Sequence, residues 1–515
     1  MLRKQIMAVI AAVAVAASAF IGAPTATAAS DKVLNWGSAV DVTTPWEPYA
    51  MSDGHFRPIM ALAYESLLKV RTDGKTIDPG LATKWVWKGN KALVLTLRSG
   101  VKFSDGTALD AAAVKANLDR VLVNKYAGPR TGALNNVSDV AVVNPTTVQV
   151  NLKQPDSLLP LWLSLNMGYM VSPKAIASAD KTGNLADLLT ATDGTGPYVL
   201  NWGASVKGSK YTFDRNPGYW QKGAALTKAF PFDQIVVKVY TNATARANAL
   251  RSGDIDIALV GAFDMPAVDK AGFQVITENL DVIALRLTDR NGENVKALGD
   301  LRVRQALNYA INRDQFGAFG VGTSQSFTKG LDAYNPKWDD FYKYDPAKAK
   351  SLLAAAGASN LTLSVAGIAD PTFSAIAQIV QADLRAVGVT LNITNEANIF
   401  AAAGNPKYQG FFFPYGAASS ASVVNDIFGP GKVRLNPLGQ SDPKLMALLD
   451  TYLASTKAAD QGKAAQAIGQ YVTSNALEIP LARLTYYVGY NQKKIKGVSF
   501  TTGNVYPQYF GISPK

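Results

Sequence analysis

The feature that most constrains the fold of this chain is a strand, a helix and a second strand in close succession. Apolar residues alternate along Ile235–Tyr240, a helical stretch covers Ala243–Arg251 and ends at Gly253, and a second apolar run covers Ile255–Val260. Two strands joined by one helix normally lie parallel in the same sheet. The pattern therefore predicts an α/β fold with a parallel strand pair.

The second half of the chain repeats one way of starting a helix. Amphipathic stretches begin at Asp345-Pro346, Asp370-Pro371 and Asp442-Pro443, and the first two are followed by Gly357 and Gly388. Asp caps the free N–H groups of a helix start, Pro fits the first turn, and Gly adopts the left-handed conformation that ends many helices. We predict three helices at these positions.

The first half of the chain is richer in strand patterns. Trp85–Trp87 and Leu93–Leu97 flank the turn Lys88–Asn90, which predicts a β-hairpin, and Asp110 precedes an amphipathic helix. The chain has 515 residues, which exceeds one ordinary core. We expect two α/β lobes and an extra β-rich domain.

The N-terminus has the pattern of a secretory signal peptide. Arg3 and Lys4 precede the apolar, Ala-rich run Ile6–Ile21, and Ala26-Thr27-Ala28 matches a cleavage site. We predict that residues 1–29 are a signal peptide; an uncleaved anchor is the alternative, disfavoured by the short apolar run. The chain has no cysteine, so it is not lipid-anchored through one. We expect an exported protein in the periplasm or at the extracellular face of the cytoplasmic membrane.

The excess of basic residues does not indicate nucleic-acid binding. The formal net charge is +12, but the basic residues are spread along the chain, and Lys493-Lys494 is about the densest pair. A nucleic-acid site would gather them into a patch or stripe. We expect no nucleic-acid partner.

The sequence lacks the residues that common catalytic sites require. His55 is the only histidine, no GxSxG or GxxxxGK[ST] motif occurs, and a zinc site would need more His or Cys ligands. Asp254 and Asp256 share a strand face but are too close for an inverting acid/base pair, so we interpret them as structural. We predict no enzyme, no catalytic residue, no metal site and no cofactor. An exported α/β protein without catalytic groups suggests a binding protein.

Short motifs distributed along nearly the whole mature chain carry a family resemblance. In order they are YESLL (64–68), LRSGVKFSDGT (97–107), GTGPY (194–198), RNPGYW (215–220), GDID (253–256), VRQALNYAI (303–311) and YDP (344–346). With these motifs the chain resembles the family 5 extracellular solute-binding proteins of bacterial ABC importers, the dipeptide, oligopeptide and nickel-binding class.

The resemblance implies a two-lobed clamshell of the type II periplasmic-binding-protein class with an extra third domain. Residues 30–64, 186–283 and 485–515 would form lobe I, residues 65–185 the extra domain carried on it, and residues 284–484 lobe II. The lobes would close on a solute about a hinge. A monomeric receptor would then deliver the solute to membrane permease subunits that a separate ATPase drives.

The stretch FFFPYGAASSASVVNDIF, residues 411–428, departs from the peptide-binding relatives. By resemblance, Phe413 takes the place of a Trp, and Gly416 that of an Asp that pairs with the α-amine of a peptide. A buried ammonium without a carboxylate is costly, so the missing Asp argues against an ordinary free-amine peptide. We expect Phe413 and Tyr415 to stack on a ligand, and residues 416–422 to offer it backbone groups and hydroxyls.

Further candidate ligand contacts follow from position within the family. They are Ser52, Asp53 and His55 in one loop, Gly261 after a strand, and Tyr486 and Tyr487 at the return to lobe I. Asp53 is a possible replacement for the missing amine partner.

The resulting functional prediction is a receptor for a peptide or peptide-like solute. Within the same role, an amine-free solute such as an oligosaccharide is the alternative. Two other classes stay open: a secreted hydrolase, which would depend on His55, and an envelope regulator that binds no small solute.

Overall fold

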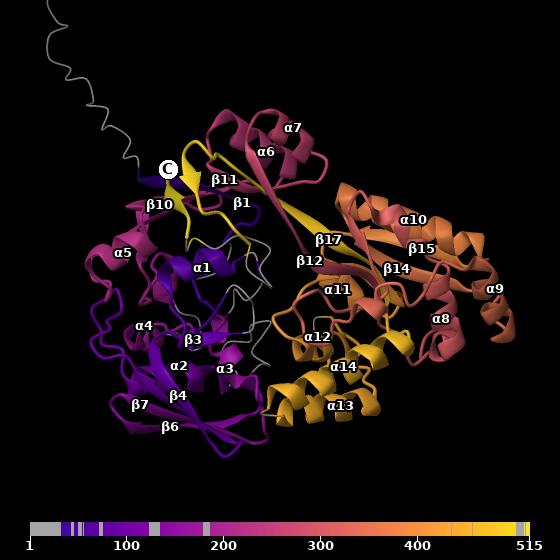
Figure 1. Ribbon diagram of the computed structural model, residues 1–515, viewed down its shortest axis with the longest axis horizontal. Coiled ribbons are helices and arrows are strands. Elements are labelled where there is room, and N and C mark those ends of the chain that lie inside the picture. The colour runs from indigo at the N-terminus through magenta and orange to yellow at the C-terminus, as the bar shows by residue number, and fades with distance from the viewer. Residues whose placement is uncertain are drawn as a thin grey trace, which may run out of the picture.

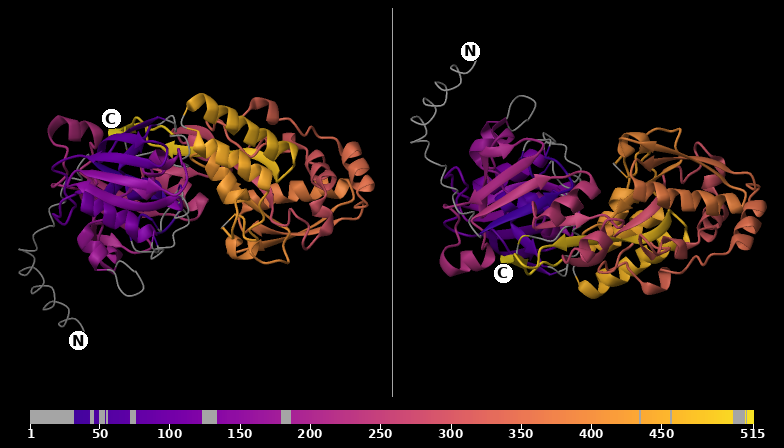
Figure 2. Two further views of the ribbon diagram at one scale, coloured as in Figure 1. Left: turned by 90° about the horizontal axis from the view of Figure 1, so that it is seen from below. Right: turned by 90° about the horizontal axis from the view of Figure 1, so that it is seen from above.

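The computed structural model describes residues 32–42, 46–49, 54, 56–71, 76–122, 134–178, 186–433, 435–455, 457–500, 509 and 511–515. The predicted signal peptide lies outside these residues. Figure 1 shows two bodies joined by two long strands, β12 (Gln274–Leu287) and β17 (Ile479–Tyr490), and Figure 2 shows the same bodies side by side from below and above. We keep the names lobe I, extra domain and lobe II for the predicted ranges, a division that we propose for this chain.

One eleven-stranded mixed sheet runs through both bodies. From the lobe II edge the order is β15 (Thr390–Glu396), β14 (Thr362–Ile368), β16 (Gly410–Tyr415), β12, β17, β11 (Ile257–Val260), β1 (Val33–Ser38), β10 (Gln234–Val239), β9 (Lys210–Arg215) and β8 (Tyr198–Val206), with β13 (Gly320–Gly322) beside β17. Short two-stranded sheets are formed by β2 (Leu68–Val70) with β3 (Ile77–Pro79) and by β18 (Ile495–Lys496) with β19 (Ser513–Pro514).

The strand–helix–strand unit is present, but its two strands do not pair with each other. β10 and β11 flank β1, and each is parallel to it. The connecting helix α6 (Ala243–Ser252) begins at Asn242, whose side chain accepts from Ala245 N, and ends at Gly253 with φ +81°. The prediction of parallel strands is confirmed, and the predicted direct pairing is wrong because a strand from the chain start lies between them.

The three Asp-Pro helices begin as predicted. They are α9 (Pro346–Ala355), α10 (Pro371–Ala386) and α13 (Pro443–Ala454), and the Asp before each Pro accepts a backbone N–H of the first turn. The other helices are α1 (Arg57–Ala63), α2 (Ala111–Leu122), α3 (Leu159–Trp162), α4 (Pro173–Ala177), α5 (Gly223–Ala229), α7 (Met265–Lys270), α8 (Leu301–Tyr309), α11 (Ile399–Ala403), α12 (Ser420–Phe428) and α14 (Ala458–Ser474). Within the described ranges no helix is long and apolar enough to cross a membrane.

The extra domain is a four-stranded antiparallel sheet covered by α2. The order is β4 (Ala82–Lys88), β5 (Ala92–Leu97), β7 (Thr147–Leu152) and β6 (Val137–Asn144), and β4 and β5 form the predicted hairpin. A buried ion pair between Arg120 of α2 and Glu47 of lobe I connects this domain to lobe I, with Nη2–Oε1 at 3.0 Å.

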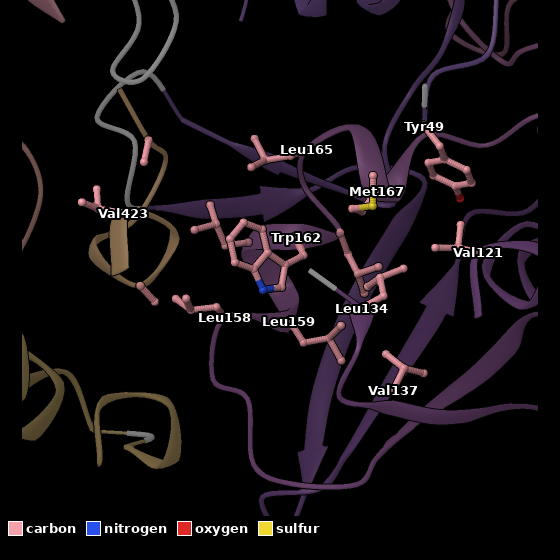
Figure 3. Packing of buried hydrophobic residues seen from close by; sticks show 14 of the residues in the cluster. Tyr49, Val121, Leu134, Val137, Leu158, Leu159, Trp162, Leu165, Met167 and Val423 are labelled. Atoms are coloured by element: carbon pink, nitrogen blue, oxygen red, sulfur yellow. The ribbon is translucent and has the colours of Figure 1, made fainter. Parts of the chain in front are cut away.

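The extra domain also packs directly on lobe II. Its buried Leu158 and Trp162 belong to one continuous apolar cluster with Val423 of α12, and Figure 3 shows this arrangement. Ser157 N donates to Leu453 O at 3.0 Å, and Gln461 Nε2 donates to Ser157 Oγ at 2.9 Å. The extra domain therefore bridges the two lobes.

An ion pair with almost no exposure joins the two long strands. Arg286 Nη1 of β12 donates to Glu478 Oε2, next to the start of β17, at 2.5 Å, and both side chains are about 2 % exposed or less. Removing one member of a buried pair leaves an uncompensated charge. We expect Glu478→Ala to lower the free energy of unfolding by about 3–5 kcal/mol in urea denaturation. Asp340→Ala, which removes an ion pair with Lys343 whose side chains are 79 % and 75 % exposed, is the control and should change little. Equal effects of the two substitutions would contradict the expectation.

Asp156, next to the interdomain contact residue Ser157, gives the stability of the protein a pH dependence. Desolvation raises the pKa of its carboxyl above the ordinary value, although Leu158 N donates to it at 3.0 Å. The folded protein then binds this proton more tightly than the unfolded chain, so stability falls as pH rises from about 4 through the raised pKa. We expect Asp156→Asn to remove this part of the fall, measured by urea unfolding across that range. An unaltered pH profile would argue against it.

Candidate ligand-binding site

The aromatic run of the stretch 411–428 forms strand β16, which pairs with β12. Phe411 and Phe412 are fully buried and belong to different apolar clusters, as alternation along a strand requires. Phe413 stays half-buried, and its ring lies 4.9 Å from the ring of Phe400. Of the three rings, only that of Phe413 retains surface that a ligand can contact.

Tyr415 is engaged within the protein. It is 8 % exposed, its hydroxyl donates to the carboxylate of Asp426, and the guanidinium of Arg286 lies 5.8 Å from its ring centroid. Its role as a stacking face stays a prediction, and the structure leaves it little exposed surface for that role.

The serines after Gly416 use their hydroxyls inside lobe II. Ser419 caps α12 by accepting Ser422 N at 3.1 Å, and the two hydroxyls lie 2.9 Å apart. Ser420 donates to the carboxylate of Asp332 and accepts Ala333 N at 3.0 Å. All three serines are buried. The hydroxyls are thus engaged at the start of α12 and with Asp332, and their contact with a ligand stays a prediction.

A carboxylate from another strand lies against Gly416. A Cβ built on Gly416 would be 2.1 Å from Asp281 Oδ1 and 3.0 Å from Leu280 O. Asp281 belongs to β12, is partly exposed, and accepts the hydroxyl of Tyr486 on its Oδ2 at 2.6 Å. The pairing of β12 with β17 is irregular between Asn279 and Asp281, which turns this part of β12 relative to its neighbours. The structure therefore brings two predicted residues, Gly416 and Tyr486, together around Asp281.

The sequence-based prediction missed Asp281. Gly416 by itself indicates the loss of an acidic group, and nothing in the local pattern indicates that a residue of a distant strand lies beside it. The signal that could have found it is the pairing of β12 with β16, in which Val282 lies opposite Tyr415.

The other predicted contact residues are placed differently or lie outside the described part. Tyr487 follows Tyr486 on β17, so the two side chains point to opposite faces, and Tyr487 packs against the cluster of α6 and α7. Gly261 comes directly after Val260, which pairs with Tyr487, and a Cβ on it would be 2.9 Å from Asp264 Oδ2. Ser52, Asp53 and His55 lie outside the described residues.

The described residues show structural roles for the paired acids. Asp256 is buried and accepts Asn35 N at 2.9 Å and Lys494 Nζ at 2.9 Å, while Asp254 accepts Lys238 Nζ at 2.7 Å. The pKa of Asp254 is lowered by its hydrogen bond from Lys238. Among the residues that the structure places, no group of three or more His, Cys, Asp or Glu could hold a metal ion.

Comparison with known proteins shows a family match. A sequence model of the bacterial extracellular solute-binding proteins, family 5 (middle part), matches residues 76–423. The glutathione-binding protein GsiB of Salmonella paratyphi A is 31% identical over 392 residues, which are 73% of this chain and 71% of that protein.

Solved structures show the same fold. AgaA of A. tumefaciens R10, in complex with agropinic acid, has a TM-score of 0.81 at 22% identity, over 94% of this chain and 99% of that one. DppA from Helicobacter pylori, in complex with the peptide STSA, has a TM-score of 0.79 at 20% identity, over 94% of this chain and 98% of that one.

Two lobes on one mixed sheet, joined by two long strands, define a periplasmic binding protein of type II, so the predicted fold class is confirmed. The chain belongs to the bacterial extracellular solute-binding proteins, family 5. This is a family of transport binding proteins and not of enzymes, and the predicted role as a solute receptor of an ABC importer is confirmed.

The close approach of Gly416 and Asp281 predicts energetic coupling between them. A methyl group at position 416 must displace the carboxylate, so we expect Gly416→Ala to destabilise the protein by about 1–3 kcal/mol. In an Asp281→Ala background the same substitution should cost clearly less, because the obstructing carboxylate is gone. Thermal or urea unfolding of the four proteins measures the coupling. Additive effects would show that the two positions are independent.

Proposed function

We propose that this chain captures a peptide-like solute with a free amine and delivers it to an ABC importer. The observation that carries the proposal is the carboxylate of Asp281 in the space beside Gly416. A carboxylate has about four acceptor positions, so Asp281 can hold the Tyr486 hydroxyl and also accept N–H groups of a ligand ammonium. We propose that Asp281 takes the role of the amine partner that the residue at position 416 does not supply.

The proposed site lies between lobe I and lobe II, where β12, β16 and β17 meet. Asp281 would pair with the amine, the half-buried Phe413 would contact an apolar part of the solute, and Tyr486 would hold the carboxylate in place. Tyr415, Gly416, Gly261 and Tyr487, with Ser52, Asp53 and His55, remain proposed neighbours of the solute. The ligands of two similar proteins support a peptide: GsiB is a glutathione-binding protein, and the DppA structure contains the peptide STSA.

We propose that residues 1–29 direct export and that the mature chain acts as a monomer outside the cytoplasmic membrane. Its closed form would dock on permease subunits driven by a separate ATPase. The contact of the extra domain with lobe II, through Ser157 and Leu453, supports a closed arrangement of the lobes here.

Thermal unfolding of the mature protein against a solute panel tests the function. The panel contains glutathione, short peptides, their N-acetylated forms and oligosaccharides. A solute at ~100 times its Kd adds roughly 2.7 kcal/mol to the free energy of unfolding, which raises the Tm measurably. We expect free-amine peptides to raise the Tm and N-acetylated peptides to fail. Stabilisation by oligosaccharides alone would replace the proposal with the amine-free alternative, and no stabilisation by any member would favour an envelope regulator.

Charge removal at Asp281 tests the role of this residue. We expect Asp281→Asn to weaken binding of the free-amine peptide by at least about tenfold in isothermal titration, because a charge-assisted hydrogen bond becomes a neutral one. Glu278→Gln is the matched control, since Glu278 is an exposed acid on the same strand, and it should leave the affinity unchanged. Equal affinities of Asp281→Asn and the unaltered protein would overturn the assignment.

A further inference from the structure

A cavity lies within lobe II, at the C-terminal end of α12. Its volume is about 310 Å³, and its wall includes Arg290 after β12, Arg304 of α8, Phe428 at the end of α12, and Gln440 and Asp442 before α13. None of these residues belongs to the proposed solute site around Asp281. The cavity is therefore a separate feature that the transport function does not explain.

Two buried guanidinium groups in this wall bond only to neutral oxygens among the described residues. Arg290 donates to Leu287 O at 2.6 Å, to Asn436 Oδ1 at 3.0 Å and to Gln440 O at 2.7 Å. Arg290 and Arg304 are each 8 % exposed. Burial lowers the pKa of Arg290 to about 10, and the charge of Glu478, which is paired with Arg286, opposes this shift only in part.

Arg304, in the same wall as Arg290, is a second buried cation that donates only to neutral oxygens among the described residues. Its donors go to backbone carbonyls, including Leu298 O at 2.8 Å and Ala476 O at 3.2 Å. Burial also lowers the pKa of its guanidinium, more than the charges of Asp300 and Asp442 raise it. A buried charge is normally offset by an opposite charge. Two such cations on one cavity wall favour an anion inside it.

Gln440 provides an unused donor at the same wall. It is 5 % exposed, its Oε1 accepts Asn291 N at 3.0 Å, and its buried Nε2 has no hydrogen-bond acceptor among the residues that the structure places. A buried donor without an acceptor costs free energy, and native proteins usually satisfy such groups. An acceptor within the cavity would satisfy it.

The one acidic group of the wall is already engaged. Asp442 caps α13 by accepting Lys444 N at 2.9 Å and Leu445 N at 3.0 Å, and it accepts the hydroxyl of Tyr471 at 2.9 Å. Its hydrogen bonds thus come from the helix start and from Tyr471, and none comes from either guanidinium. Two cations against one acid leave the wall with a positive balance.

We propose that this cavity is a binding site for a small oxyanion, such as phosphate or a carboxylate, held by Arg290, Arg304 and Gln440. The anion would offset the two buried cations and accept the free Nε2–H of Gln440. The site would act independently of the solute site, because the two share no residue.

Isothermal titration and thermal unfolding with inorganic phosphate test the proposal, with sodium chloride of equal ionic strength as the reference. We expect saturable binding and a rise in Tm that chloride does not produce. Gln440→Glu, nearly identical in shape, places a carboxylate beside the guanidinium groups. In the absence of phosphate, Gln440→Glu should be more stable than the unaltered protein. It should also lose phosphate binding.

Two further variants make the outcome specific. Gln470→Glu adds the same charge at an exposed position of α14 and should keep phosphate binding. Asp281→Asn should weaken peptide binding and leave phosphate binding unchanged, so failure of one site is distinguishable from failure of the other. A phosphate effect that does not saturate, or one that Gln440→Glu retains, would overturn the proposal.

Discussion

The ion pair of Arg286 with Glu478 holds together the strands of lobe II that continue to lobe I and to the proposed solute site. The guanidinium reaches Glu478 beside β17, the carbonyl of Phe413 on β16 at 3.1 Å and the carbonyl of Val282 on its own strand at 3.0 Å. One side chain therefore links three neighbouring strands, of which β12 and β17 continue into lobe I. Because Val282 lies next to Asp281, this interaction also fixes the position of the proposed amine partner.

The extra domain contacts both lobes and is therefore more than an addition to the surface of lobe I. It has an ion pair to lobe I through Arg120 and shares an apolar cluster with lobe II through Trp162. Separating the lobes would expose part of this apolar surface to water, which opposes opening. The energy available for closing thus includes a contribution from protein–protein contact in addition to that from the solute.

Local sequence signals predicted local structure well. The Asp370 cap, the hairpin of β4 and β5, and the turn at Gly253 depend on short-range hydrogen bonds and backbone conformation, which the residue types specify. The family motifs predicted the fold class. Contacts between distant segments were not predictable in this way. The insertion of β1 between β10 and β11 and the placement of Asp281 against Gly416 depend on strand order, and no local pattern encodes that order.

The continuity of the sheet has a mechanical consequence for Asp281. Lobe I and lobe II are connected by a hydrogen-bonded ribbon of two strands, and such a ribbon bends most easily where its pairing is irregular, at Asn279/Asp281 and Ile283/Ala284. A group at a pivot sweeps the smallest arc when two bodies rotate about it. A solute bound through Asp281 would therefore keep one end nearly stationary while the lobes move around it, and the distance of its other end from the pivot would determine how far they can close.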